Sequence, residues 1–238
     1  MSLQEKENIL FSEWKSGLCP ESKRFFISDG VVDEEAWNSV PQKVLFLLKE
    51  VNGGESWDER KYLYGYNTED KYLQTHSQTI STVIQWAYGA MHIDQAISWE
   101  QVEQVISCVE TQTSLLRKIA LVNIKKISGA GIVDYQNFDK YFNDTKNIDY
   151  LKKQLAIYKP NIIICGGTGY YYQQLYKDFV LPVKKWQKTQ RGIGYCIVED
   201  TIVIDYCHPQ ARIAANIKYY ALIDAIAEIK LKNCGLNL

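Results

Sequence analysis

The segment at 202–212 combines an apolar strand pattern with side chains that could do chemistry. The apolar run ends in the letters CHPQAR at 207–212, directly before a helical pattern. An imidazole held at a strand end, such as that of His208, can stabilise an oxygen on which negative charge develops. Pro209 fixes the turn, and Arg212 could contact a phosphate or reach into a duplex. The alternatives are a structural histidine and a surface charge at a helix start.

A catalytic thiol and a metal site are both disfavoured. Cys207 could be a nucleophile if the neighbouring imidazolium lowered its thiol pKa, but neighbours in a strand point to opposite faces. The six cysteines contain no C-x-x-C pair, which argues against a zinc ribbon or an iron–sulfur cluster. His76 and His92 show no metal-ligand spacing. We therefore expect no metal and no cofactor.

The apolar run at 43–48 is followed by Glu50, Asn52 and two glycines. Gly53 and Gly54 permit a ligand to approach the backbone closely. Asn52 or Glu50 could hold a water molecule for attack. A plain turn would have much the same sequence, so both interpretations stay open.

Four aromatic residues occupy the polar stretch that follows, which is poor in helix signals. They are Trp57, Tyr62, Tyr64 and Tyr66. Aromatic side chains in a loop can form a stacking platform for bases, and the alternative is that they pack onto the domain.

Asn123 interrupts the apolar run Ile119–Ile124. A buried amide must find partners, and its adjacent donor and acceptor match the edge of a pyrimidine. A structural hydrogen bond to a neighbouring loop is the alternative. Lys125 and Lys126 follow, and they could meet a phosphate or face water.

The turn Gly166–Gly169 stands between a strand pattern and a helical pattern. Its N–H groups, including that of Gly167, could receive an anion at the helix N-terminus. The turn matches neither the P-loop nor G-x-G-x-x-G. It is also compatible with a tight turn in which Thr168 caps the helix.

The elements that would position these residues alternate along the chain. Four β-branched, apolar runs have the length of strands: Lys43–Leu48, Ile119–Ile124, Asn161–Cys165 and Thr201–Tyr206. Continuous apolarity is typical of central strands buried on both faces. Helical spacing recurs around them, at Ser77–Tyr88, Ile148–Tyr158, Thr168–Phe179 and Ile213–Ile229.

This alternation predicts an α/β fold, a three-layer α/β/α sandwich around a central, mainly parallel four-stranded sheet. Tyr195–Glu199, which runs into Asp200–Tyr206, predicts a hairpin that adds an antiparallel edge strand. In such sheets ligands bind beyond the carboxyl ends of the strands. All four predicted strands end in polar or glycine-rich residues.

Length and composition fit one domain over residues 1–238. The chain is 46% hydrophobic and 13% aromatic, and it can bury a full core. We expect residues 1–40 to form a helical N-terminal extension on that core, with Phe11, Trp14, Phe25 and Trp37 as anchors.

Charge and hydropathy limit the partners. The chain carries 27 Lys+Arg against 28 Asp+Glu, so any contact with DNA must be local. No signal peptide and no run of ~18 apolar residues is present, so we expect a cytoplasmic protein without membrane association. No obligatory protein partner is evident.

Taken together, the strand ends resemble those of the uracil-DNA glycosylase superfamily. Residues 44–54 (VLFLLKEVNGG) resemble its water-positioning motif, and residues 120–126 (ALVNIKK) resemble the strand with a base-reading asparagine. Residues 208–212 (HPQAR) resemble its His-Pro motif, and the His-Pro-x-x-Arg form is most similar to the single-strand-selective monofunctional branch. The resemblance extends loosely over residues 44–229.

The resemblance implies a role for each matching residue. Asn52 would position the attacking water, with Glu50 as the alternative because no proline follows the asparagine. Asn123 would read the base edge, and His208 would stabilise charge on the departing base. Arg212 would enter the space left by a flipped nucleotide. Further candidates for substrate binding are Gly53, Gly54, Gly167 and Lys125.

The function implied is that of a monofunctional DNA glycosylase. Such an enzyme flips uracil or a related altered base out of single- or double-stranded DNA and hydrolyses its N-glycosidic bond. A second hypothesis is a non-catalytic nucleic-acid or nucleotide-binding protein that keeps the fold. A third is an unrelated small-molecule enzyme that holds phosphate at Gly166–Gly169.

Overall fold

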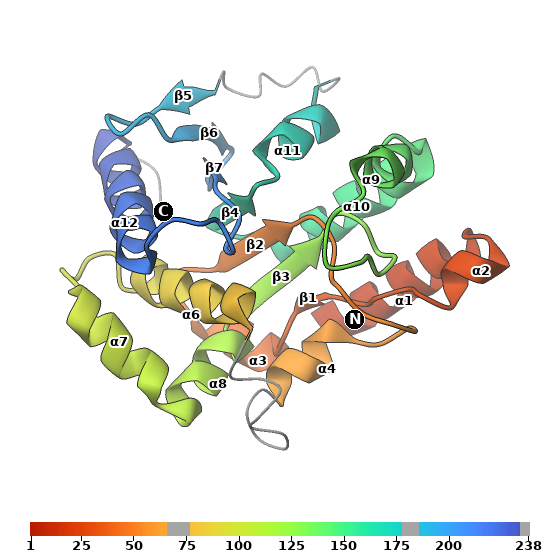
Figure 1. Ribbon diagram of the computed structural model, residues 1–238, viewed down its shortest axis with the longest axis horizontal. Coiled ribbons are helices and arrows are strands. Elements are labelled where there is room, and N and C mark those ends of the chain that lie inside the picture. The colour runs from red at the N-terminus through yellow and green to blue at the C-terminus, as the bar shows by residue number, and fades with distance from the viewer. Residues whose placement is uncertain (66–76, 178–185, 234–238) are drawn as a thin grey trace.

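The computed structural model describes residues 1–65, 77–177 and 186–233 (Figure 1). In these ranges the protein is α/β, with a mixed seven-stranded sheet in the order β1-β3-β2-β4-β7-β6-β5. The strands are β1 (Gly30–Val31), β2 (Val44–Leu48), β3 (Ile119–Asn123), β4 (Ile162–Gly166), β5 (Gln187–Lys188), β6 (Gly194–Val198) and β7 (Thr201–Tyr206).

Each of the four predicted strands is present, as β2, β3, β4 and β7. β2 pairs in parallel with β3 and with β4, and β4 pairs in parallel with β7. β6 and β7 pair antiparallel, which confirms the predicted hairpin. The sheet is larger than the predicted four strands. β5 pairs outside β6, so β5 rather than β6 is the edge strand on the β7 side of the sheet. β1 and β5 have two residues each, too few for an apolar pattern to reveal them.

Helices surround the sheet. They are α1 (Leu3–Ser16), α2 (Pro20–Lys23), α3 (Glu34–Ser39), α4 (Glu59–Tyr64), α6 (Gln78–Met91), α7 (Trp99–Ser107), α8 (Val109–Arg117), α9 (Tyr135–Phe142), α10 (Thr145–Tyr158), α11 (Gly169–Leu175) and α12 (Ala215–Lys232). The helical patterns correspond to α6, α10, α11 and α12. α11 ends at Leu175, and the predicted end at Phe179 lies outside the described residues.

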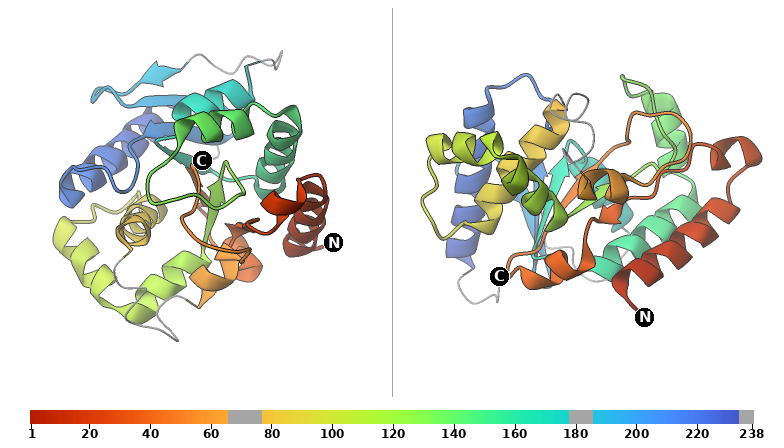
Figure 2. Two further views of the ribbon diagram at one scale, coloured as in Figure 1. Left: turned by 45° about the vertical axis from the view of Figure 1, so that its right-hand side comes forward. Right: turned by 90° about the horizontal axis from the view of Figure 1, so that it is seen from below.

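Alternate residues of each central strand face two separate hydrophobic clusters. In β2, Phe46 packs in one cluster and Leu47 in the other, and both are fully buried. The first cluster includes side chains of α6, α8 and α12, and the second includes side chains of α1, α10 and α11. Figure 2 shows α6 and α12 on one side of the sheet and α1 and α10 on the other. Helices therefore cover both faces.

Residues 1–40 are part of the core rather than a purely helical addition. β1 pairs antiparallel with β3, so this region contributes a strand to the sheet. The predicted anchors Phe11, Trp14 and Trp37 are buried, whereas Phe25 is 37% exposed and its neighbour Phe26 is buried. No helix among the described residues is long and apolar enough to cross a membrane.

Candidate functional site

A pocket of about 600 Å³ lies at the carboxyl ends of β2, β3 and β7. This is the edge at which open α/β sheets bind ligands. Its lining includes four of the predicted site residues, Glu50, Asn52, Asn123 and His208. A larger groove of about 920 Å³ runs past α3 and α8 and contains none of them.

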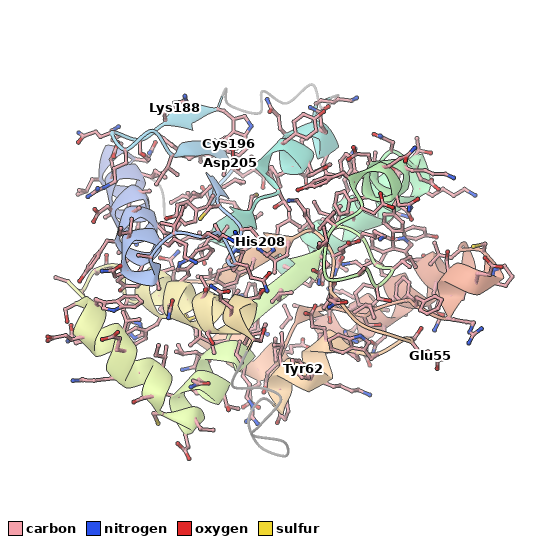
Figure 3. The ribbon with its side chains drawn as sticks, in the orientation of Figure 1. Glu55, Tyr62, Lys188, Cys196, Asp205 and His208 are labelled. Carbon is pink, nitrogen blue, oxygen red and sulfur yellow. The ribbon has the colours of Figure 1, made fainter. Side chains whose placement is uncertain are left out.

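His208 follows β7 and enters the pocket from its loop (Figure 3). Its Nδ1 accepts a hydrogen bond from the backbone N–H of Gln210 at 3.1 Å. In the neutral ring the proton must then sit on Nε2, which leaves Nε2–H as a donor. Burial, and then the charges of Lys49 and Lys218, lower the pKa of His208 below its usual value. At neutral pH the side chain is thus an uncharged hydrogen-bond donor.

The His208 loop is held from beneath by Lys218 of α12. This side chain is 2% exposed, and its Nζ donates to the carbonyl of Pro209 at 2.6 Å and to that of Ala211 at 3.4 Å. A buried ammonium that satisfies two loop carbonyls fixes the loop backbone. The position of His208 therefore depends on a residue of the next helix.

Asn123 ends β3 and is 2% exposed. Its Nδ2 donates to Glu59 Oε2 at 2.7 Å and to Asp29 Oδ2 at 3.3 Å. Both neighbours are carboxyl groups, so the amide must turn its NH₂ toward them. Within the described residues no hydrogen bond reaches Oδ1. The structural hydrogen bond is thus present, and Oδ1 remains without a partner among the described residues in a side chain that lines the pocket.

Glu59 belongs to the site but was not among the sequence candidates. It begins α4 and is 5% exposed, and burial together with Asp29 raises its pKa to about 8. The polar sequence around Glu59 predicts a loop, whereas Asp58 caps a helix there by accepting from the backbone N–H of Arg60 at 3.0 Å. The run Asp-Glu-Arg at 58–60 is a helix-start signal that could have located it.

The two adjacent lysines have different partners, and Lys126 does not face water, one of its two predicted environments. Lys126 is fully buried, and its Nζ lies 2.5 Å and 2.7 Å from the two oxygens of Asp29. Lys125 Nζ lies 2.5 Å from Glu50 Oε2 at the pocket. Each lysine is packed against a carboxyl group, Glu50 for Lys125 and Asp29 for Lys126, that the local sequence does not reveal.

The loop after β2 forms an exposed part of the pocket. Asn52 is exposed and makes a parallel bridge with Gly129. A Cβ at Gly129 would lie 2.3 Å from the Glu50 carboxyl group, so only glycine fits against it. Gly53 lies against Trp57, because a Cβ at Gly53 would be 3.0 Å from the indole Nε1, whereas a Cβ at Gly54 would meet open space.

Two of the four aromatic candidates line the pocket. Trp57 and Tyr62 pack edge to face with ring centroids 5.6 Å apart. Tyr64 instead stacks against Arg117, whose guanidinium carbon lies 3.9 Å from the centroid of the Tyr64 ring. Tyr66 is outside the described residues, as is His76.

The Gly166–Gly169 turn is filled by the chain itself. The carboxylate of Asp205 on β7 accepts from the N–H of Gly169, and a Cβ at Gly169 would lie 2.1 Å from its Oδ1. Thr168 donates to the Leu47 carbonyl at 2.6 Å instead of capping α11. Gly167 has φ +72° and would place a Cβ 3.5 Å from that of His208, so it permits close packing beside the pocket without lining it.

The remaining candidates lie outside the pocket lining. Arg212 is exposed and forms no hydrogen bond or ion pair with the described residues. Cys207 packs against a core cluster, where burial raises the pKa of its thiol. No group of three His, Cys, Asp or Glu side chains in the described ranges could hold a metal ion.

No protein-family model matches this chain, and a search of the curated proteins found no match.

Proposed function

We propose that this protein hydrolyses the N-glycosidic bond of uracil, or of a related altered base, in DNA. The observation that carries the proposal is the convergence of Asn52, Asn123 and His208 on one pocket, although they come from three distant parts of the chain. A volume of about 600 Å³ is ample for a flipped nucleotide. As the alternation of strands and helices predicts, we assign the fold as a three-layer α/β/α sandwich with β3-β2-β4-β7 as its parallel centre.

The roles follow from the donors and acceptors available. Asn123 Oδ1 accepts from the pairing edge of the base, and the Nε2–H of His208 donates to a base oxygen as negative charge builds there. The bond between C1′ and the base nitrogen breaks, the water oxygen that Asn52 holds bonds to C1′, and the proton that this water loses passes to solvent. The base leaves as an anion held by His208 and is protonated in solution.

We assign the water to Asn52 rather than to Glu50. The Glu50 carboxylate is already engaged by Lys125 at 2.5 Å, and its side chain is only 4% exposed. The exposed amide of Asn52 can accept from and donate to a water without a change of charge. Arg212, free and exposed, would contact the DNA backbone.

The test is excision from oligonucleotides that contain one uracil, single- and double-stranded, with alkali used to cleave any abasic site. We expect the protein to leave abasic sites and the His208→Ala variant to leave almost none. Intact strands under conditions in which a control glycosylase cleaves them would contradict uracil excision.

A second function, binding of a base in DNA without turnover, is favoured by the Lys125–Glu50 ion pair. The Glu50 carboxylate is held by Lys125, and the amide of Asn52 cannot take a proton from water. This function predicts tight binding to uracil-containing strands by both the parent protein and His208→Ala, with no abasic product from either.

A further inference from the structure

Glu59 is the polar neighbour of Asn123 inside the pocket. Its Oε2 accepts from Asn123 Nδ2 at 2.7 Å, and its side chain belongs to the pocket lining. Among the described residues Asn123 is the single hydrogen-bond partner of the Glu59 side chain, so Oε1 is left for a ligand. Both side chains line the same pocket, and within the described residues Asn123 Oδ1 and Glu59 Oε1 accept no hydrogen bond.

The hydrogen bonds that the Asn123 amide nitrogen already donates limit which ligand groups Asn123 can bind. Both hydrogens of Nδ2 are directed at carboxyl groups, so this residue offers a ligand an acceptor and no donor. The pairing edge of uracil has a ring N–H beside a carbonyl oxygen, and it needs an acceptor and a donor side by side. A second residue must supply the donor.

We propose that Glu59 is that residue, a specificity determinant whose protonated carboxyl group donates to the base carbonyl while Asn123 Oδ1 accepts from the adjacent ring N–H. The ligand class is a nucleobase with N–H next to C=O. This inference rests on the proposed function, because it takes a base to be the ligand of the pocket.

The surroundings of Glu59 favour the protonated form. Burial raises its pKa most, and the negative charges of Asp29 and Asp58 raise it further. The charge of Lys126 and the hydrogen bond from Asn123 lower the pKa of Glu59, but Lys126 is already paired with Asp29. Burial, and then the charge of Glu59, raise the pKa of Tyr62 on the next turn of α4. The net pKa of about 8 leaves a donor O–H at neutral pH.

The experiment is calorimetric binding of free uracil to the whole chain and to Glu59→Gln, between about pH 6 and about pH 9. For the parent protein we expect affinity to fall about tenfold between about pH 7 and about pH 9, as the donor proton is lost. Glu59→Gln keeps an acceptor for Asn123 and a donor for the base. Its affinity should equal that of the parent at pH 7 and stay level as the pH rises.

Three controls define the result. Glu55→Gln changes a peripheral carboxylate that is 77% exposed (Figure 3), and it should keep the pH profile of the parent. Glu59→Leu, checked for folding by circular dichroism, should lose binding about tenfold or more at every pH. 3-Methyluracil, which lacks the ring N–H, should bind weakly to parent and variants alike.

A parent profile that stays level, or that rises with pH, would overturn the inference, as would a folded Glu59→Leu that binds like the parent. A preference for cytosine over uracil would also overturn it. The excision assay separates the two proposals. Level binding with active excision refutes only the role of Glu59, whereas pH-dependent binding without excision refutes only the hydrolysis. Absence of both binding and excision refutes both.

Discussion

Lys125 and Lys126 are neighbours in sequence, yet they pair with carboxylates in two different groups of residues at the pocket. Lys126 pairs with Asp29, and both side chains are fully buried. Lys125 pairs with Glu50 at the same 2.5 Å, but its own side chain is 13% exposed. We call the set Asp29, Glu59, Asn123 and Lys126 the inner wall, and the set Glu50, Asn52 and Lys125 the outer wall.

The comparison separates two tasks within one site. The inner wall is fixed by buried hydrogen bonds, so its donors and acceptors are arranged before a ligand arrives, as reading a base requires. The outer wall is open to solvent at Asn52, where an attacking water must enter. If this division is right, changes to the inner wall should affect stability and changes to the outer wall should affect turnover.

The largest expected effect comes from Lys126→Met. It leaves Asp29 buried without its cation, and we expect a loss of about 3–5 kcal/mol in the free energy of unfolding. Lys125→Met is the matched control, and it should cost about 1–2 kcal/mol because the Lys125–Glu50 pair is not fully buried, with the Lys125 side chain 13% exposed. Urea denaturation of both variants measures the difference. Equal losses would contradict the division into two walls.

The next effect is on turnover. His208→Ala removes the donor to the departing base, and we expect excision to slow about 100- to 1000-fold. Because His208 is half-buried in a loop held by Lys218, the midpoint of urea denaturation should hardly move. Single-turnover excision rates measure the first quantity. A rate within threefold of the parent would place the stabilising donor elsewhere.

Asn52→Ala tests the outer wall directly. The side chain is exposed, so we expect less than about 0.5 kcal/mol of change in stability. Loss of a water-positioning group should slow excision about tenfold or more while uracil affinity is unchanged. Parallel measurement of rate and affinity separates these quantities, and weaker uracil binding with an unchanged rate would assign Asn52 to ligand binding.

The smallest effect is expected for Arg212→Ala. Arg212 lies outside the pocket lining, so affinity for free uracil should not change. Loss of one phosphate contact should weaken binding to DNA a few-fold and reduce the slope of log affinity against log salt by about one. An unchanged slope would show that Arg212 does not contact the phosphate backbone.

How far the sequence predicts the site depends on which interactions are local. Continuous apolar runs predict β2, β3, β4 and β7, and the polar residues at their ends include four that line the pocket. Of the inner wall, Asn123 alone is predictable in this way. Lys126 is buried because Asp29, 97 residues away in the chain, meets it. Glu59 is buried because β3 brings Asn123 to it, and an acidic residue in isolation indicates a surface position.

The most direct test of the account is a crystal structure of His208→Ala with a single-stranded oligonucleotide that contains one uracil. We expect the uracil to be flipped into the pocket, with its N3 about 3 Å from Asn123 Oδ1 and a carbonyl oxygen about 3 Å from Glu59. Its sugar should face Asn52. A base bound outside the pocket, or with its pairing edge turned away from the inner wall, would contradict the account.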